Sequence, residues 1–104
     1  MAKVEIFAGA CGMNSIVEAT MNSSKCALFV DSECDAIERL VEDLGEVDPF
    51  QEISFRDEGP KTLRLSSEHC YHTACPVPVG IIKAVEIVAG LNLPVDASIK
   101  FIED

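Results

Sequence analysis

The spacing of the apolar residues changes partway along this 104-residue chain. Over roughly the first 30 residues they alternate with polar residues or form short runs rich in β-branched side chains, a pattern typical of strands. From residue 35 they recur three or four residues apart, which is typical of helices. Strands grouped early and helices grouped late predict an α+β fold, with the helices on one face of a mixed or antiparallel sheet. The length is that of a single domain over residues 1–104.

Three strands are expected first, at residues 3–8, 16–21 and 26–30. Turn residues separate them, at 9–14 and at Asn22-Ser23-Ser24. The first of these segments contains two glycines but lacks the spacing and the lysine of a phosphate-binding loop. Such short connections predict a three-stranded meander.

A helix is predicted after the meander, because Ser32 stands three residues before Asp35 in a capping-box arrangement and apolar residues follow at helical spacing as far as Gly45. The pattern weakens over residues 46–61, which we expect to be mostly loop. Within that loop, three apolar residues could pack a short helical turn: Phe50, Ile53 and Phe55.

Two further helices and a last strand are expected in the remaining chain. Residues 62–72 are weakly helical, and residues 80–89 are apolar almost all round before Gly90 and Pro94, which predicts a largely buried helix. Residues 96–102 alternate again and are predicted to close the sheet as a final strand.

The direction of these elements predicts that four cysteines converge. The first and third strands of a meander run the same way, so Cys11 and Cys34, which follow them, lie at one edge of the sheet. If the three helices alternate in direction, Cys70 and Cys75 at the last helix junction return to that edge. Cys26 begins the third strand at the opposite end and is predicted to be a core residue.

The densest group of reactive side chains is His69-Cys70-Tyr71-His72-Thr73-Ala74-Cys75. Thiolates and imidazoles both bind zinc, and thiolates hold iron–sulfur clusters, although neither zinc-ribbon nor ferredoxin spacing is present. We therefore predict a cysteine-ligated metal site holding an iron–sulfur cluster or zinc. Its ligands would be Cys11, Cys34, Cys70 and Cys75, with His69 or His72 as substitutes.

Two alternatives stay open at this stage. In the first, the chain is a thiol redox protein in which Cys75 or Cys70 reacts; Cys75 precedes a helix, whose dipole stabilises a thiolate. In the second, it is a small binding or assembly module whose cysteines are structural, because free cysteine is commonly buried as a small apolar residue. The residues do not decide whether the protein is an enzyme.

Charge and hydropathy bound the partners and the compartment. The formal net charge of −10 disfavours nucleic acid and anionic membrane surfaces. The N-terminal residues lack the apolar core of a secretion signal, and no apolar run reaches membrane-spanning length. We therefore expect a cytoplasmic protein with reduced cysteines, with a protein partner or a homo-oligomer left open.

Several segments together resemble a known family. The stretch Ala74-Cys75-Pro76-Val77-Pro78-Val79-Gly80 is the most distinctive, and the similarity extends to residues 83–86 and 89–94. Phe7-Ala8-Gly9-Ala10-Cys11-Gly12 and Ser32-Glu33-Cys34 belong to it as well. Over the whole chain the sequence resembles a family of small uncharacterised proteins from methanogenic archaea and anaerobic bacteria. The resemblance implies a habitat and no activity.

Overall fold

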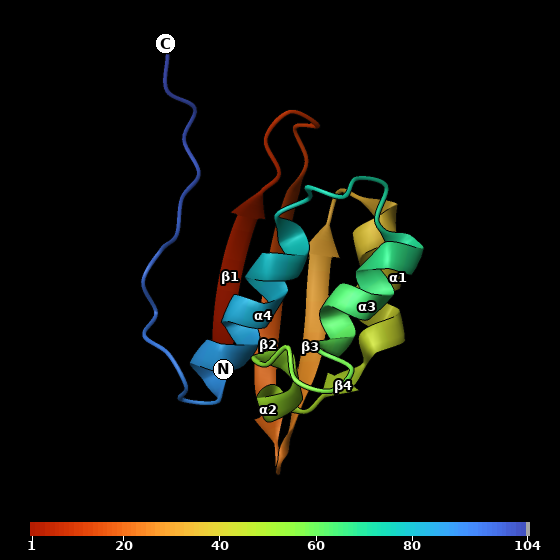
Figure 1. The fold of residues 1–104 in the computed structure, drawn as a ribbon, viewed down its shortest axis with the longest axis vertical. Helices are drawn as coiled ribbons and strands as arrows, with labels where there is room; N and C mark the ends of the chain where they lie inside the picture. The colour runs from red at the N-terminus through yellow and green to blue at the C-terminus, as the bar shows by residue number, and fades with distance from the viewer. Residues whose placement is uncertain (104) are drawn as a thin grey trace.

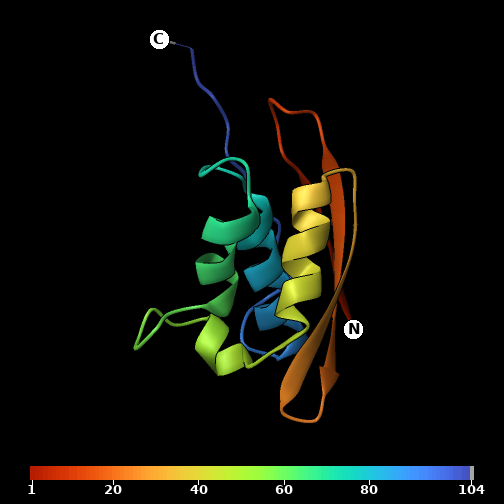
Figure 2. The same ribbon diagram turned by 90° about the vertical axis from the view of Figure 1, so that its right-hand side faces the viewer.

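The structure, a computed structural model, describes residues 1–103 and shows an α+β fold, as the sequence predicts. A four-stranded antiparallel sheet in the order β1-β2-β3-β4 has its helices on one face (Figures 1 and 2). The strands are β1 Ala2–Phe7, β2 Asn14–Asn22, β3 Lys25–Ser32 and β4 Glu46–Val47. The helices are α1 Asp35–Leu44, α2 Pro49–Glu52, α3 Lys61–His69 and α4 Val77–Val88.

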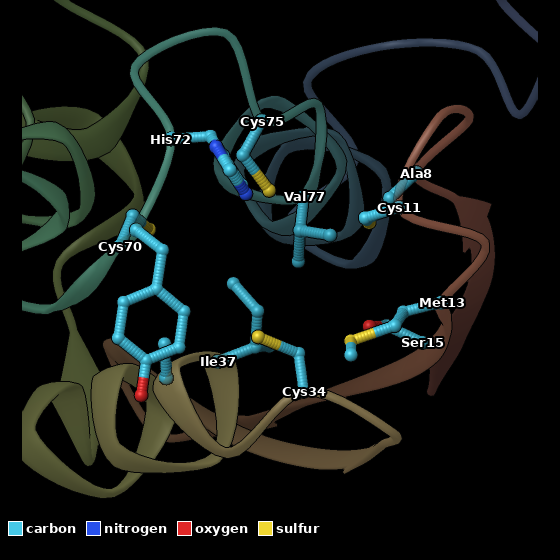
Figure 3. A pocket seen from close by; sticks show the side chains of 12 residues that line it. Ala8, Cys11, Met13, Ser15, Cys34, Ile37, Cys70, His72, Cys75 and Val77 are labelled. Atoms are coloured by element: carbon cyan, nitrogen blue, oxygen red, sulfur yellow. The ribbon is translucent and has the colours of Figure 1, made fainter.

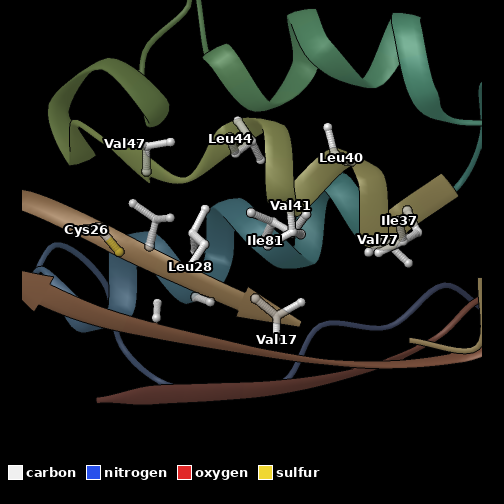
Figure 4. Close-up of a cluster of buried hydrophobic side chains, with 13 residues drawn as sticks. Val17, Cys26, Leu28, Ile37, Leu40, Val41, Leu44, Val47, Val77 and Ile81 are labelled. Atoms are coloured by element: carbon white, nitrogen blue, oxygen red, sulfur yellow. The ribbon is translucent and has the colours of Figure 1, made fainter. Parts of the chain in front are cut away.

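The meander of β1, β2 and β3 is confirmed, and its pleat sets the core. On the inner face of β2, Val17 and Ala19 are fully buried. On β3, Cys26 is fully buried and Leu28 is nearly so, and Cys26 is therefore the core residue that its strand position predicts. Burial raises the pKa of the Cys26 thiol. α1 and α4 cover this face with aliphatic side chains (Figure 4), among them Ile37, Leu40, Leu44, Ile81 and Val85.

The helices alternate in direction as expected (Figure 1): α1 runs back along the sheet, α3 returns and α4 runs back again. The junction of α3 and α4 therefore lies at the same edge as the β1–β2 loop. No helix among residues 1–103 is long and apolar enough to cross a membrane.

The predicted capping box at the start of α1 is wrong. The N-cap residue is Cys34, whose side chain makes no capping hydrogen bond. The Ser32 hydroxyl instead accepts a hydrogen bond from the Cys34 N–H at 3.0 Å, and the Ser32 N–H donates to Glu38 Oε1 at 3.1 Å. Ser32 still pairs with Ser15 at the end of β3, so its backbone belongs to the sheet and cannot also begin the helix.

Residues 46–61 are mostly loop, as predicted, and the possible short helical turn forms as α2; the short strand β4 was not predicted. Three apolar residues that could have packed in this segment are exposed instead: Phe50, Ile53 and Phe55. The segment is anchored instead by Glu52, which is 1% exposed. Its carboxylate accepts hydrogen bonds from the N–H groups of Lys61 and Thr62, the first two residues of α3, at 2.8 and 2.9 Å, and from the Thr62 hydroxyl. Glu52 thus caps α3 from outside the helix.

The predicted final strand at residues 96–102 is not formed. The structure has neither helix nor strand from residue 93 to residue 103. Ile99 is 88% exposed and Phe101 is fully exposed. An alternating pattern suits a pleated backbone, but a strand also needs a neighbouring strand to bond with, and none lies beside this segment within residues 1–103.

α4 lies unusually close to β1 at one point. A Cβ atom added to Gly80 would collide with Cγ1 of Ile6 on β1. Gly80 thus lets the helix backbone rest directly on a strand side chain, and this close approach fixes the height of α4 above the sheet.

We expect Gly80→Ala to destabilise the protein by about 1 to 2 kcal/mol, because overpacking outweighs the gain in helix propensity. In an Ile6→Ala background the clash is removed, so the same change is expected to be neutral or stabilising. Urea unfolding of the wild type, both single variants and the double variant measures this coupling. Equal effects of Gly80→Ala in both backgrounds would contradict the close contact.

We expect Glu52→Ala to cost about 3 kcal/mol of stability, because it leaves buried donors at the start of α3 without an acceptor. Glu58→Ala, at an exposed position in the same segment, is the matched control and is expected to change stability by less than about 0.5 kcal/mol. Thermal and urea unfolding compare the two variants. Similar losses for both would show that Glu52 is not an anchor.

Candidate functional site

A small pocket of about 80 Å³ opens at the sheet edge where the β1–β2 loop, the start of α1 and the α3–α4 junction meet (Figure 3). Its wall is mainly apolar and sulfur-bearing, with contributions from residues far apart in the sequence. The lining residues are Ala8, Cys11, Met13, Ser15, Cys34, Ala36, Ile37, Cys70, Tyr71, His72, Cys75 and Val77.

The convergence predicted from strand and helix directions is confirmed, since Cys11, Cys34, Cys70 and Cys75 all line this pocket. All four are free thiols; Cys11 is exposed and the other three are half-buried. Figure 3 shows the Cys34 and Cys75 side chains pointing into the space between α1 and α4. Cys26 does not line the pocket and lies in the core.

Of the two predicted substitute ligands, only His72 lines the pocket (Figure 3). His69 is at the C-terminal end of α3 and turns toward α1 instead. Its Nε2 lies 2.9 Å from a carboxylate oxygen of Asp43, so this imidazole is already partnered away from the thiols.

Cys34 is held at the pocket wall by the end of β3. Its N–H donates to the Ser32 hydroxyl, and that hydroxyl shares a 2.7 Å hydrogen bond with the nearly buried hydroxyl of Ser15. These contacts connect the N-cap position of α1 to two strands. The Cys34 sulfur therefore stands on the rigid part of the fold.

Cys70 is a half-buried thiol with two other cysteine sulfurs nearby. It ends α3, where its N–H donates to the Ser66 carbonyl at 2.9 Å. Burial raises the pKa of its thiol most, and the Cys75 sulfur raises it next. A hydrogen bond with Ser66 lowers this pKa, and the Cys34 sulfur adds the smallest rise. At neutral pH the Cys70 thiol is therefore protonated.

Tyr71 fastens the α3–α4 junction to α1. Its hydroxyl donates to the Asp35 carboxylate at 3.2 Å and accepts from Arg39 at 3.1 Å, while the Arg39 guanidinium lies 5.8 Å from its ring centre. The hydrogen bond from Arg39 and then that from Tyr71 lower the pKa of Asp35. This cluster, which we call the Tyr71 latch, holds the residue after Cys70 against the start of α1, where Cys34 is the N-cap.

Cys75 lies at the N-terminal end of α4, one residue before its N-cap Pro76. Its N–H donates to the His72 carbonyl at 3.3 Å, which closes a short turn between the two residues. Lys83, the lysine of α4, does not line the pocket, and its amino group lies 3.9 Å from the Glu86 carboxylate.

The four thiols share one pocket but are not arranged as a finished coordination sphere. Among residues 1–103, no group of three or more cysteine, histidine or acidic side chains stands close enough to hold a metal ion. The donor set suits thiophilic metals, because thiolates select zinc, copper(I) and iron–sulfur clusters. Metal binding would require the sulfurs to move closer together.

Sequence reasoning missed the apolar wall and the Tyr71 latch. Tyr71 stands between Cys70 and His72, so an aromatic residue inside a cluster of ligands was a visible sign. Its partners lie more than 30 positions earlier in the chain. Only the packing of α3 against α1 brings them together.

Comparison with known proteins gives a family and no activity. Residues 2–101 match the model of a family of unknown function (DUF6951). No curated protein and no solved structure matches the chain.

The raised pKa of Cys70 predicts that this thiol reacts with iodoacetamide only at higher pH than an ordinary cysteine, because the thiolate is the reactive form. Cys75→Ser is expected to lower the pH at which Cys70 reacts without restoring the ordinary value, since burial, the larger cause, remains. Mass spectrometry of peptides alkylated over a pH series measures this.

Cys11→Ser is the matched control for that experiment, because Cys11 lines the same pocket but does not contribute to the Cys70 shift. It is expected to leave the pH midpoint of Cys70 unchanged. If the pH midpoint of Cys70 shifts equally in both variants, or shifts in neither, the proximity of Cys70 and Cys75 is contradicted.

Proposed function

Since the chain belongs to a family of unknown function (DUF6951), we propose from the site itself that the four-thiol pocket binds a thiophilic metal, as zinc or an iron–sulfur cluster. The ligands are Cys11, Cys34, Cys70 and Cys75, and His72 is the substitute ligand. The observation that carries the proposal is the meeting of four thiols from separate parts of the chain in one pocket.

The composition of the pocket supports a metal over simple burial. Cysteines that only fill space are expected to be spread through the core, as Cys26 is. Here four of the five cysteines line a single pocket, and the strand ends and helix ends that carry them are otherwise unrelated. Four sulfur donors match the coordination number of structural zinc and of iron–sulfur clusters.

Electrostatics also favour a cation at this point. The thiols stand on an acidic protein, and the pKa of Cys70 is raised by burial and by its sulfur neighbours. Four thiolates would repel one another unless a cation neutralised them. Metal affinity at this site is therefore expected to rise with pH.

Closure of the site would depend chiefly on Cys11. Cys34 is fixed by β3, and Cys70 is held by the Tyr71 latch. Cys11 is exposed in a turn whose Gly12 N–H donates to the Gly9 carbonyl at 2.8 Å. Binding would draw this loop toward the other sulfurs, so that metal uptake and loop ordering occur together.

A second candidate function is a redox dithiol formed by Cys70 and Cys75. It is favoured by the electrostatic effect of Cys75 on Cys70 and by the absence, among residues 1–103, of ligands already spaced for a metal. Both thiols would lose a proton and one electron each to an oxidant as the disulfide forms. The raised pKa of Cys70 makes this thiol a poor attacking group in such a pair.

The metal proposal predicts that protein prepared without oxygen contains about one zinc ion, or the iron of one cluster, per chain. A Cys34→Ser, Cys75→Ser variant is expected to lose that metal. Cys26→Ala is the matched control: it removes a thiol outside the pocket, costs about 1 to 2 kcal/mol of stability and retains the metal. Elemental analysis and the absorption spectrum provide the measurement.

Chelation of the metal is expected to lower the melting temperature of the wild type and not that of the double variant, because a ligand bound only to the folded state stabilises it. Metal-free protein that forms a Cys70–Cys75 disulfide in oxidised glutathione would favour the redox candidate instead. Metal-free protein whose thiols stay reduced and unreactive would leave all four cysteines structural.

A further inference from the structure

The C-terminal segment, residues 93–103, leaves the body of the protein and exposes most of its apolar side chains. Leu93 and Val95 are 74% and 69% exposed, and Ile99, Phe101 and Ile102 are between 88% and fully exposed. Figures 1 and 2 show this segment running past the end of the sheet. It lengthens the molecule to 46 Å, against 28 and 27 Å in the other directions. Monomeric proteins rarely leave so many large apolar side chains in water along one segment.

The way the chain leaves α4 directs this segment away from its own sheet. Gly90 adopts a φ of 74°, and the Leu91 N–H donates to the Glu86 carbonyl at 2.8 Å, which ends the helix in a tight turn. The Asn92 amide donates to the Glu86 carboxylate at 3.0 Å, and the Val95 N–H bonds back to Leu93 at 2.8 Å. In Figure 2 the segment up to residue 103 lies on the helix side of the sheet, away from the plane of β1.

β1 offers the complementary surface. It is the first strand of the sheet, so its outer edge has no partner within residues 1–103. Its inward side chains, Ala2, Val4 and Ile6, are buried or half-buried beneath the helices, while Lys3 and Glu5 face outward and are exposed. An open strand edge with this alternation is a template for another strand.

We propose that two copies of this chain pair by exchanging these segments, so that residues 96–102 of each copy add a strand to the β1 edge of the other. Ala97, Ile99 and Phe101 would extend the apolar inner face beside Val4 and Ile6. Asp96, Ser98 and Lys100 would continue the polar outer face.

A second copy fits because one reciprocal exchange supplies what both surfaces lack. The edge of β1 gains backbone hydrogen bonds, and the C-terminal segment gains the neighbouring strand and the apolar cover that it needs. A two-fold pair satisfies both copies at once and leaves no free segment for further growth. The turn after α4, with its Glu86 contacts, lies outside the exchanged residues 96–102 and stays intact.

The charge of the chain adds a salt dependence. Each copy has a formal net charge of −10, so two copies repel one another and salt screens that repulsion. The dimer is therefore expected to become tighter as salt concentration rises. This is the opposite of the trend for an interface held by ion pairs.

Light scattering on a sizing column tests the proposal with the full chain in a reducing, chelating buffer, so that neither a Cys11 disulfide nor a bridging metal can join two copies. The expected mass is twice that of the chain. The Ile99→Asp, Phe101→Asp variant, with charges on the inner face of the added strand, is expected to be monomeric at the same concentration. Ser98→Asp, a charge on the outer face of the same segment, is the matched control and is expected to stay dimeric.

Hydrogen exchange of the C-terminal amides completes the test, with protection expected in the dimer and lost in the Ile99→Asp, Phe101→Asp variant. A wild type that is monomeric over about a hundredfold range of concentration overturns the proposal. A monomer with protected C-terminal amides would show that the segment pairs with its own β1, and a dimer that survives the double substitution would show another interface; either result also overturns it. None of these outcomes depends on metal binding by the thiol pocket.

Discussion

The contact between Gly80 and Ile6 sets the distance between α4 and the sheet, and the arrangement of the rest of the molecule depends on that distance. With no Cβ at Gly80, the helix backbone lies against a β1 side chain, and Val77, Ile81 and Val85 reach the core shared with α1. A larger residue would lift α4 and open this core, because interiors are packed too tightly to absorb a methyl group. Cys75 comes just before this helix, so the position of α4 above the sheet also sets the position of Cys75.

The thiol pocket is assembled at the end of this helix from parts of unequal rigidity. Cys34 and Cys75 lie at the starts of packed helices, and the Tyr71 latch ties the junction that carries Cys70 to α1. Cys11 is on an exposed turn. In the proposed metal site, these elements would hold three of the sulfurs, and Cys11 would move toward them when metal binds. The protonated state of Cys70 limits the repulsion that three neighbouring thiolates would cause.

Much of the fold follows from local patterns. The meander, α1, α3 and α4 lie close to their predicted positions because alternation and helical spacing record which face of each element is buried. The start of α1 was misread, because Ser32 has a capping side chain but its backbone is held in the sheet. Glu52 was missed since a buried carboxylate has no local pattern: its partners at the start of α3 are nine and ten residues away. The strand predicted at residues 96–102 does not form, because no neighbouring strand lies beside it within residues 1–103.

The sequence alone determined that four thiols reach one edge of the sheet, because strand direction and helix order follow from the order of the elements. It also determined that Cys26 is apart from them, since the opposite end of β3 is distant from that edge. The tertiary structure decided which side chains fill the pocket between them. The turn of the α3–α4 junction places His72 in the pocket wall, whereas His69 pairs with Asp43. The same junction brings Tyr71 into contact with Asp35 and Arg39 on α1. Such choices depend on angles and distances between packed elements, which no residue spacing along the chain records.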